Sequence, residues 1–114
     1  MRSRYAAFAL GLGAYLVRTL ASSHPDREEP PEELARSLGS VAGRQRFMGL
    51  RIVSATVAPD GEHGEVLFHA RIFGRGADRS FAERSTFVRE GGGWRYQAGE
   101  MVPEAELPAI LGPA

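Results

Sequence analysis

The stretch EVLFHARIF, residues 65–73, decides the fold, because its polar and apolar side chains alternate as they do in a half-buried strand. Its apolar face carries Val66, Phe68, Ala70 and Ile72. Its polar face carries Glu65, His69 and Arg71. We therefore expect one side of this strand to face the core and the other to face outward.

Three further strands are expected around this stretch. Residues 47–57 are rich in β-branched side chains, and the turn sequence Pro59-Asp60-Gly61 follows them. After a turn over residues 74–78, residues 79–89 form a third strand with Phe81 and Phe87 on one face. Glycines 91–93 predict a tight hairpin into residues 94–101, where Trp94, Tyr96 and Ala98 are expected to share one face.

Helices precede this antiparallel meander. Residues 5–20 repeat apolar side chains at helical spacing, but Gly11 and Gly13 favour a break between two helices that meet at an angle. Pro31, followed by acidic residues, predicts the start of a third helix that ends at Gly39. Helices followed by strands indicate an α+β domain, which we place at residues 1–102, with a C-terminal tail over residues 103–114.

The composition narrows the class of protein. The 114 residues leave room for one domain. Cysteine is absent, which excludes disulfides and thiolate metal sites. The formal net charge is zero, and every basic side chain other than histidine is Arg, with Arg44, Arg46 and Arg51 as the one local cluster. Nucleic acid is therefore not an expected partner.

The first 23 residues admit a second interpretation. Two arginines precede an uncharged run over residues 5–17, and small residues follow, as in a secretory signal. Arg18 argues against a signal, and the run is too short and too rich in alanine to span a bilayer, so no membrane partner is expected. Periodicity alone does not decide between signal and helices. An exported protein that begins near Ser22 ranks last, because it would lose much of its core.

Three parts of the chain resemble the middle domain of the bacterial YchJ-like family. They are MRSRYAAF at residues 1–8 with YLVRT at 15–19, FHAR at 68–71 with ERSTFVR at 83–89, and GWRYQAG at 93–99. The resemblance implies a nuclear-transport-factor-two-like fold, in which a curved antiparallel sheet wraps around helices as a cone with an interior pocket. It also implies a bacterial cytoplasmic protein, without implying an activity.

Two departures from the family pattern affect what carries over. YchJ-like proteins usually have a cysteine-rich SEC-C motif before this domain and often after it, and without cysteine its zinc binding does not carry over. The chain also begins at a methionine that lies inside the domain in its relatives. We hypothesise that translation starts upstream, and loss of the motif is the alternative.

Glu83 is the first candidate site residue, because an unpaired carboxylate facing the core from mid-strand would be costly. We predict that it pairs with Arg2 or Arg4, since a guanidinium can bind a carboxylate through two hydrogen bonds. The pair would act as a structural latch between helix and sheet. The alternative is that Glu83 faces solvent and has no partner.

A second set of candidates would line a small-molecule pocket. Its aromatic members are Phe8, Tyr15, Trp94 and Tyr96, although aromatic residues at such spacing are more often plain core. His69 is the polar member, since with Glu65 it could form a general base and its orienting group. A lone histidine on a strand is more often half-exposed. Three scattered histidines without cysteine make a poor metal site, so neither metal nor cofactor is expected.

We therefore expect a non-catalytic binding or accessory domain. Its partner would be a small molecule, a protein, or a second copy docked on the exposed sheet face. The alternative is a small enzyme of the isomerase or dehydratase type, with Glu83, His69 or Tyr15 as its acid–base group. Fold alone does not establish an activity. We assign no catalytic residue, and the question of catalysis stays open.

Overall fold

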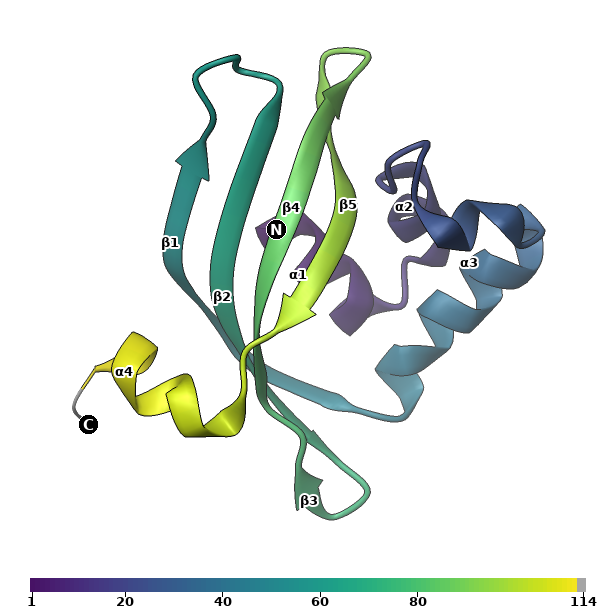
Figure 1. Cartoon of the computed structure of the whole chain (residues 1–114). Coiled ribbons are helices and arrows are strands. Elements are labelled where there is room, and N and C mark those ends of the chain that lie inside the picture. The colour runs from purple at the N-terminus through teal and green to yellow at the C-terminus, as the bar shows by residue number, and fades with distance from the viewer. Residues whose placement is uncertain (113–114) are drawn as a thin grey trace.

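The computed structural model describes residues 1–112 and shows helices packed against one face of an open, curved antiparallel sheet (Figure 1). The order of the main strands is β1 (Arg46–Val57), β2 (His63–Gly74), β4 (Phe81–Glu90) and β5 (Gly93–Met101). A short fifth strand, β3 (Ala77–Asp78), pairs with the end of β2. The expected α+β class, with N-terminal helices on a curved sheet, is confirmed.

The helical layer consists of α1 (Arg2–Leu10), α2 (Gly13–Arg18) and α3 (Pro31–Gly39), with 3-10 turns η1 (Pro25–Glu28) and η2 (Ser40–Gly43). The break expected between the first two helices is present, because Gly11 ends α1 in the left-handed conformation at φ 72°. Gly13 has a separate role. A Cβ at this position would overlap the carbonyl oxygen of Ala35, so α2 and α3 approach closely only because Gly13 has no side chain.

Residues 19–21 attach the helical layer to the edge of the sheet. The backbone N–H of Tyr96 donates to the carbonyl of Thr19 at 2.7 Å, and the N–H of Ala21 donates to the carbonyl of Tyr96 at 2.7 Å. Leu20 therefore forms a parallel bridge with Tyr96. This short segment covers part of the edge of β5 and satisfies its backbone groups.

The core lies between the helices and the concave face of the sheet. Phe68, Ala70 and Ile72 on β2 are buried there, whereas Arg71 is exposed, so the expected alternation is confirmed. A second buried group joins the helices to one another through Val17, Leu20 and Leu34. The first two helices are thus part of the packed domain.

The prediction that Ala98 shares a strand face with Trp94 and Tyr96 is wrong. The pairing of β4 with β5 shifts register between Thr86 and Phe87, so that Ala98 lies opposite Thr86 and Tyr96 lies opposite Phe87. Gln97 is the extra residue of a β-bulge, so simple alternation of side chains does not continue from Tyr96 to Ala98. Tyr96 consequently faces the core with Phe87, and Ala98 faces outward with Thr86.

The C-terminal segment runs along the outer face of the sheet as η3 (Glu104–Glu106) and α4 (Leu107–Leu111). The N–H of Val102 donates to the carbonyl of Ala82 at 2.9 Å, and Arg51 Nη1 donates to the carbonyl of Leu111 at 3.0 Å. The predicted tail over residues 103–114 corresponds to this segment, and its last two positions lie outside the described residues. Among residues 1–112, no helix has the length and apolar character needed to cross a membrane.

Candidate functional site

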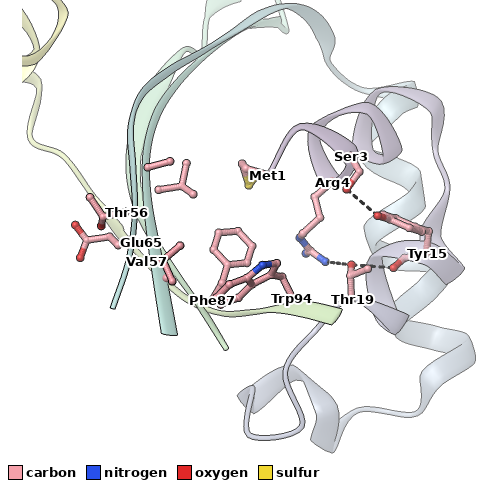
Figure 2. A pocket seen from close by; sticks show the side chains of 13 residues that line it. Met1, Ser3, Arg4, Tyr15, Thr19, Thr56, Val57, Glu65, Phe87 and Trp94 are labelled. Atoms are coloured by element: carbon pink, nitrogen blue, oxygen red, sulfur yellow. Dashed lines mark hydrogen bonds between the residues drawn. The ribbon is translucent and has the colours of Figure 1, made fainter. Parts of the chain in front are cut away.

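Two cavities lie between the helical layer and the concave face, and Met1 and Arg4 line both of them. The first, here called the Trp94 cavity, has a volume of about 260 Å³, and its walls include Tyr15, Thr19, Phe87 and Trp94 (Figure 2). The second, here called the Tyr96 cavity, has a volume of about 280 Å³, and its walls include Phe8, His24, Phe68, Glu83 and Tyr96. Arg4 therefore stands where the two cavities meet.

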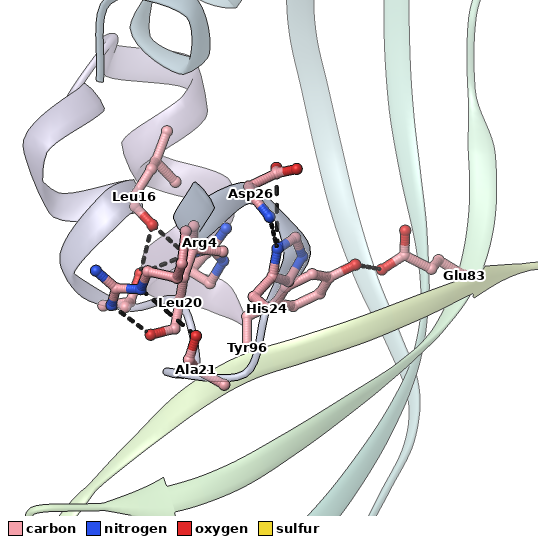
Figure 3. A network of polar contacts seen from close by, with 10 residues as sticks. Arg4, Leu16, Leu20, Ala21, His24, Asp26, Glu83 and Tyr96 are labelled. Carbon is pink, nitrogen blue, oxygen red and sulfur yellow. Dashed lines mark hydrogen bonds and ion pairs between the residues drawn. The ribbon is translucent and has the colours of Figure 1, made fainter. Parts of the chain in front are cut away.

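The polar centre of the Tyr96 cavity is the carboxylate of Glu83. It accepts a hydrogen bond from the Tyr96 hydroxyl at 2.9 Å (Figure 3) and another from the Ser85 hydroxyl at 2.5 Å. Gly99 makes this arrangement possible, because a Cβ there would overlap both the Tyr96 hydroxyl and the Glu83 carboxylate. The carboxylate is thus held by two donors from the sheet itself.

Burial raises the pKa of the Tyr96 phenol well above its ordinary value, and the adjacent Glu83 carboxylate raises it further. The phenol therefore keeps its proton at neutral pH and acts as the donor toward Glu83. This protonation state suits a structural hydrogen bond and makes Tyr96 a poor general base.

Arg4 comes from α1 and has only 6% of its surface exposed. Its Nη1 donates to the carbonyl of Leu16 at 2.8 Å and to the hydroxyl of Thr19. The guanidinium lies over the ring of Tyr96, with Cζ 4.9 Å from the ring centroid. Burial lowers the pKa of the guanidinium, which nevertheless stays charged at neutral pH because its ordinary value is so high.

The predicted latch between Glu83 and Arg2 or Arg4 differs from what the structure shows. Within residues 1–112, no ion pair at or below 4.0 Å joins Glu83 to either arginine. The physical reason is the ring of Tyr96, which contacts Arg4 through its face and Glu83 through its hydroxyl. Helix and sheet are connected through Tyr96, and the exposed Arg2 takes no part.

His24 borders the Tyr96 cavity and was not among the expected site residues. Its Nδ1 accepts a hydrogen bond at 3.1 Å from the N–H of Asp26, so the proton of the neutral ring lies on Nε2. The imidazole lies 5.7 Å from the Tyr96 ring, measured between centroids. The dipeptide His24-Pro25 is the sequence signal that could have identified this residue, because a proline after it favours the start of a helical turn. His24 caps that 3-10 turn, and the cap holds its side chain in place.

The structure divides the predicted pocket residues between the two cavities. Phe8 and Tyr96 line the Tyr96 cavity, whereas Tyr15 and Trp94 line the Trp94 cavity. His69 lines neither of them, because its position on β2 faces away from Phe68 and Ala70. Including His69 was therefore wrong, since the period of two along a strand already placed it on the outer face. Among residues 1–112 there is no cluster of three or more His, Asp or Glu side chains able to hold a metal ion.

A helical layer against a concave antiparallel sheet, with cavities between the two layers, defines the class of small two-layer α+β domains. Among solved structures, the chain is similar to a SEC-C motif containing protein from Rhodopseudomonas palustris, with a TM-score of 0.73 and 33% identity over 90% of this chain and 76% of that one. A SEC-C motif containing protein from Psychrobacter arcticus shares the fold at a TM-score of 0.67 and 22% identity, over 91% of this chain and 59% of that one.

The chain belongs to the family of the YchJ middle NTF2-like domain, whose model matches residues 1–99. It is 36% identical to a UPF0225 protein of Methylibium petroleiphilum, over 90% of this chain and 68% of that protein. It is 38% identical to a UPF0225 protein of Vibrio parahaemolyticus, over 93% of this chain and 59% of that protein. The chain thus spans about three fifths to two thirds of the length of these relatives.

Proposed function

We propose that the chain is a non-catalytic binding module that holds a small molecule between its helices and its sheet. The observation that carries this proposal is that Glu83, Tyr96 and His24, three acid–base groups that line the Tyr96 cavity, are already engaged in hydrogen bonds within the fold. Tyr96 and Ser85 donate to Glu83, and the Asp26 N–H donates to His24. Side chains whose donors and acceptors are already used in the fold are better suited to fixing the form of a cavity than to transferring protons.

The walls of the two cavities support the same function. Most of the side chains that face them are apolar, with a few polar groups at defined places, as in sites for small molecules. The exposed face of Trp94, which is 37% accessible, gives the Trp94 cavity contact with solvent. A ligand could therefore enter without unfolding of the domain.

The alternative, a small isomerase or dehydratase, rests on a different observation. His24, Tyr96 and Glu83 come from separate segments (Figure 3), and all three line the Tyr96 cavity. Because Nδ1 of His24 accepts a hydrogen bond, its Nε2–H is the one proton of this group available to a ligand. An enzyme would use it as a general acid.

The test is a titration with a mixed set of neutral, cationic and anionic fragments, followed by amide and indole NMR shifts. We expect shifts to concentrate around Trp94, Thr19 and Val66, and to disappear in Val66→Phe, which fills the Trp94 cavity. A folded protein that shows no shift at these positions with any fragment would refute the binding module. New product signals from the fragments after prolonged incubation would favour the enzyme.

A further inference from the structure

Arg4 has a buried charge without an acidic partner. Only 6% of the residue is exposed, and within residues 1–112 no carboxylate lies within 4.0 Å of its guanidinium. Carbonyl and hydroxyl oxygens and the ring of Tyr96 surround it. A buried cation is costly unless an anion or several hydrogen bonds compensate it.

The hydrogen bonds of Arg4 leave one edge of the guanidinium unused. Nη1 makes both of the contacts, to Leu16 and Thr19. Nε is buried and has no partner, and Nη2 donates to no group in the described part of the chain. Because Nε is closed off from solvent, Nη2 is the donor that a ligand beside Arg4 could reach, and a charged donor of this kind forms its stronger hydrogen bonds with a carboxylate.

The two cavities differ in how well they would accept an anion beside Arg4. The Tyr96 cavity already contains the Glu83 carboxylate and is bordered by Asp26, which would repel a second negative charge. The Trp94 cavity instead presents the hydroxyls of Ser3, Tyr15 and Thr19 next to Arg4. Its acidic lining residue, Glu65, is half-exposed and lies 3.9 Å from Arg84.

The wall opposite Arg4 is apolar. Val66, Phe87 and Trp94 line it from the sheet, and Figure 2 shows Phe87 and Trp94 across the cavity from Arg4 and Tyr15. The volume of about 260 Å³ lies just below the range of roughly 300–1,000 Å³ found for drug-sized ligands. The space therefore suits a single ring or a short branched chain with one acidic group.

We propose that the Trp94 cavity binds a small monocarboxylate with an apolar or aromatic body, and that Arg4 recognises its carboxylate. This inference rests on the proposed binding function and adds the charge and size of the ligand to it. A single guanidinium matches a single negative charge, which favours a carboxylate over a doubly charged phosphate. The hydroxyl of Ser3, which accepts from Tyr15 and keeps its own proton free, would complete the recognition of the acid group.

The test compares phenylacetate with phenylacetamide, which has nearly the same shape and no charge. The full chain is titrated with each compound, and the fluorescence of Trp94, the one tryptophan of the sequence, reports binding directly. We expect phenylacetate to bind at least about tenfold more tightly than the amide, because charge-assisted hydrogen bonds are roughly twice as strong as neutral ones. In Arg4→Gln this preference should disappear.

The matched control is Arg2→Gln, which removes an exposed charge from the same helix and should leave the preference intact. If Arg4→Gln does not fold, the comparison of the two compounds on the unaltered chain still decides. Equal binding of both compounds would overturn the carboxylate inference and leave the binding module standing. Failure of both compounds, together with failure of the mixed fragment set, would instead refute the binding module itself.

Discussion

Tyr96 connects three parts of the molecule through one side chain. Its hydroxyl donates to Glu83 on β4, and its ring lies beside Arg4 from α1 and His24 from the loop before η1. The ring also meets Phe87 edge-on, with centroids 5.7 Å apart. A substitution of Tyr96 should therefore weaken contacts in both the helical layer and the sheet.

We predict that Tyr96→Phe lowers the free energy of unfolding by about 2 kcal/mol at neutral pH, because Glu83 then loses one of its two donors. The variant should also change the alkaline limb of the stability curve. The phenol has a raised pKa in the folded state, so its contribution is fully present below the unfolded value of about 10 and is lost as the pH rises above it. Urea unfolding between about pH 8 and pH 11 measures both effects.

Tyr15→Phe is the control for this experiment, because Tyr15 donates to Ser3 in an exposed position and does not contact Glu83. It should keep the alkaline decline of the unaltered chain, whereas Tyr96→Phe should flatten it. A decline of equal steepness in both variants would show that Tyr96 is not the group responsible.

The sequence predicts that Glu83 needs a polar partner, but it names an arginine where the structure has Tyr96 and Ser85. A carboxylate on the strand face of Phe81 and Phe87 requires donors, and this requirement is readable from the alternation of the strand. The donor, Tyr96, depends on the bulge at Gln97 and on the space left by Gly99. Neither the bulge nor that space has a signature in the local sequence.

At the scale of elements, Gly13 controls how closely α2 and α3 pack. We predict that Gly13→Ala lowers the free energy of unfolding by about 1–3 kcal/mol, because its methyl group would overlap the Ala35 carbonyl and force the helices apart. Alanine otherwise favours helix over glycine, so intrinsic propensity predicts the opposite sign. Thermal and urea unfolding of the variant decide between the two.

The control is Gly43→Ala, since a Cβ at Gly43 would meet nothing within 4 Å. It should leave stability unchanged or raise it slightly. If Gly13→Ala is as stable as this control, the close approach of the two helices does not depend on the glycine. The sequence predicts the break between α1 and α2 from propensity, but it does not predict the contact of Gly13 with Ala35, because that contact depends on how the two helices pack.

At the scale of the whole molecule, the order of helices followed by strands predicts a helical layer packed on a sheet. It does not predict the position or the size of the cavities between the two layers. Each cavity is bounded by residues from both ends of the chain, such as Arg4 and Trp94. Its size depends on how far the layers stand apart, which is a property of packing and not of periodicity. Aromatic residues could be identified as candidates, but not divided between two cavities.

We predict that a chain ending at Val102 keeps the fold and loses only about 1 kcal/mol of unfolding free energy, chiefly the hydrogen bond from Arg51 to Leu111. No side chain of η3 or α4 is fully buried, and the bond from Val102 to Ala82 is retained. Circular dichroism and urea unfolding of the shortened chain measure this directly. An unfolded product would show that the C-terminal segment belongs to the core domain. A dimer formed through the outer sheet face would have to share that face with this segment.

The backbone pairing of residues 19–21 with Tyr96 also has a consequence for folding during synthesis, because it joins an early segment of the chain to a late one. Synthesis proceeds at roughly 5–20 residues per second, so the first three helices emerge seconds before the strand that must receive them. Until then the apolar side chains of Val17, Leu20 and Leu34 lack the tyrosine that completes their cluster. We therefore expect the docking of the helices on β5 to come late in folding, because contacts distant in sequence form slowly. A ribosome that stalls before β5 would release a chain with its helices uncovered, which is the kind of species that chaperones bind.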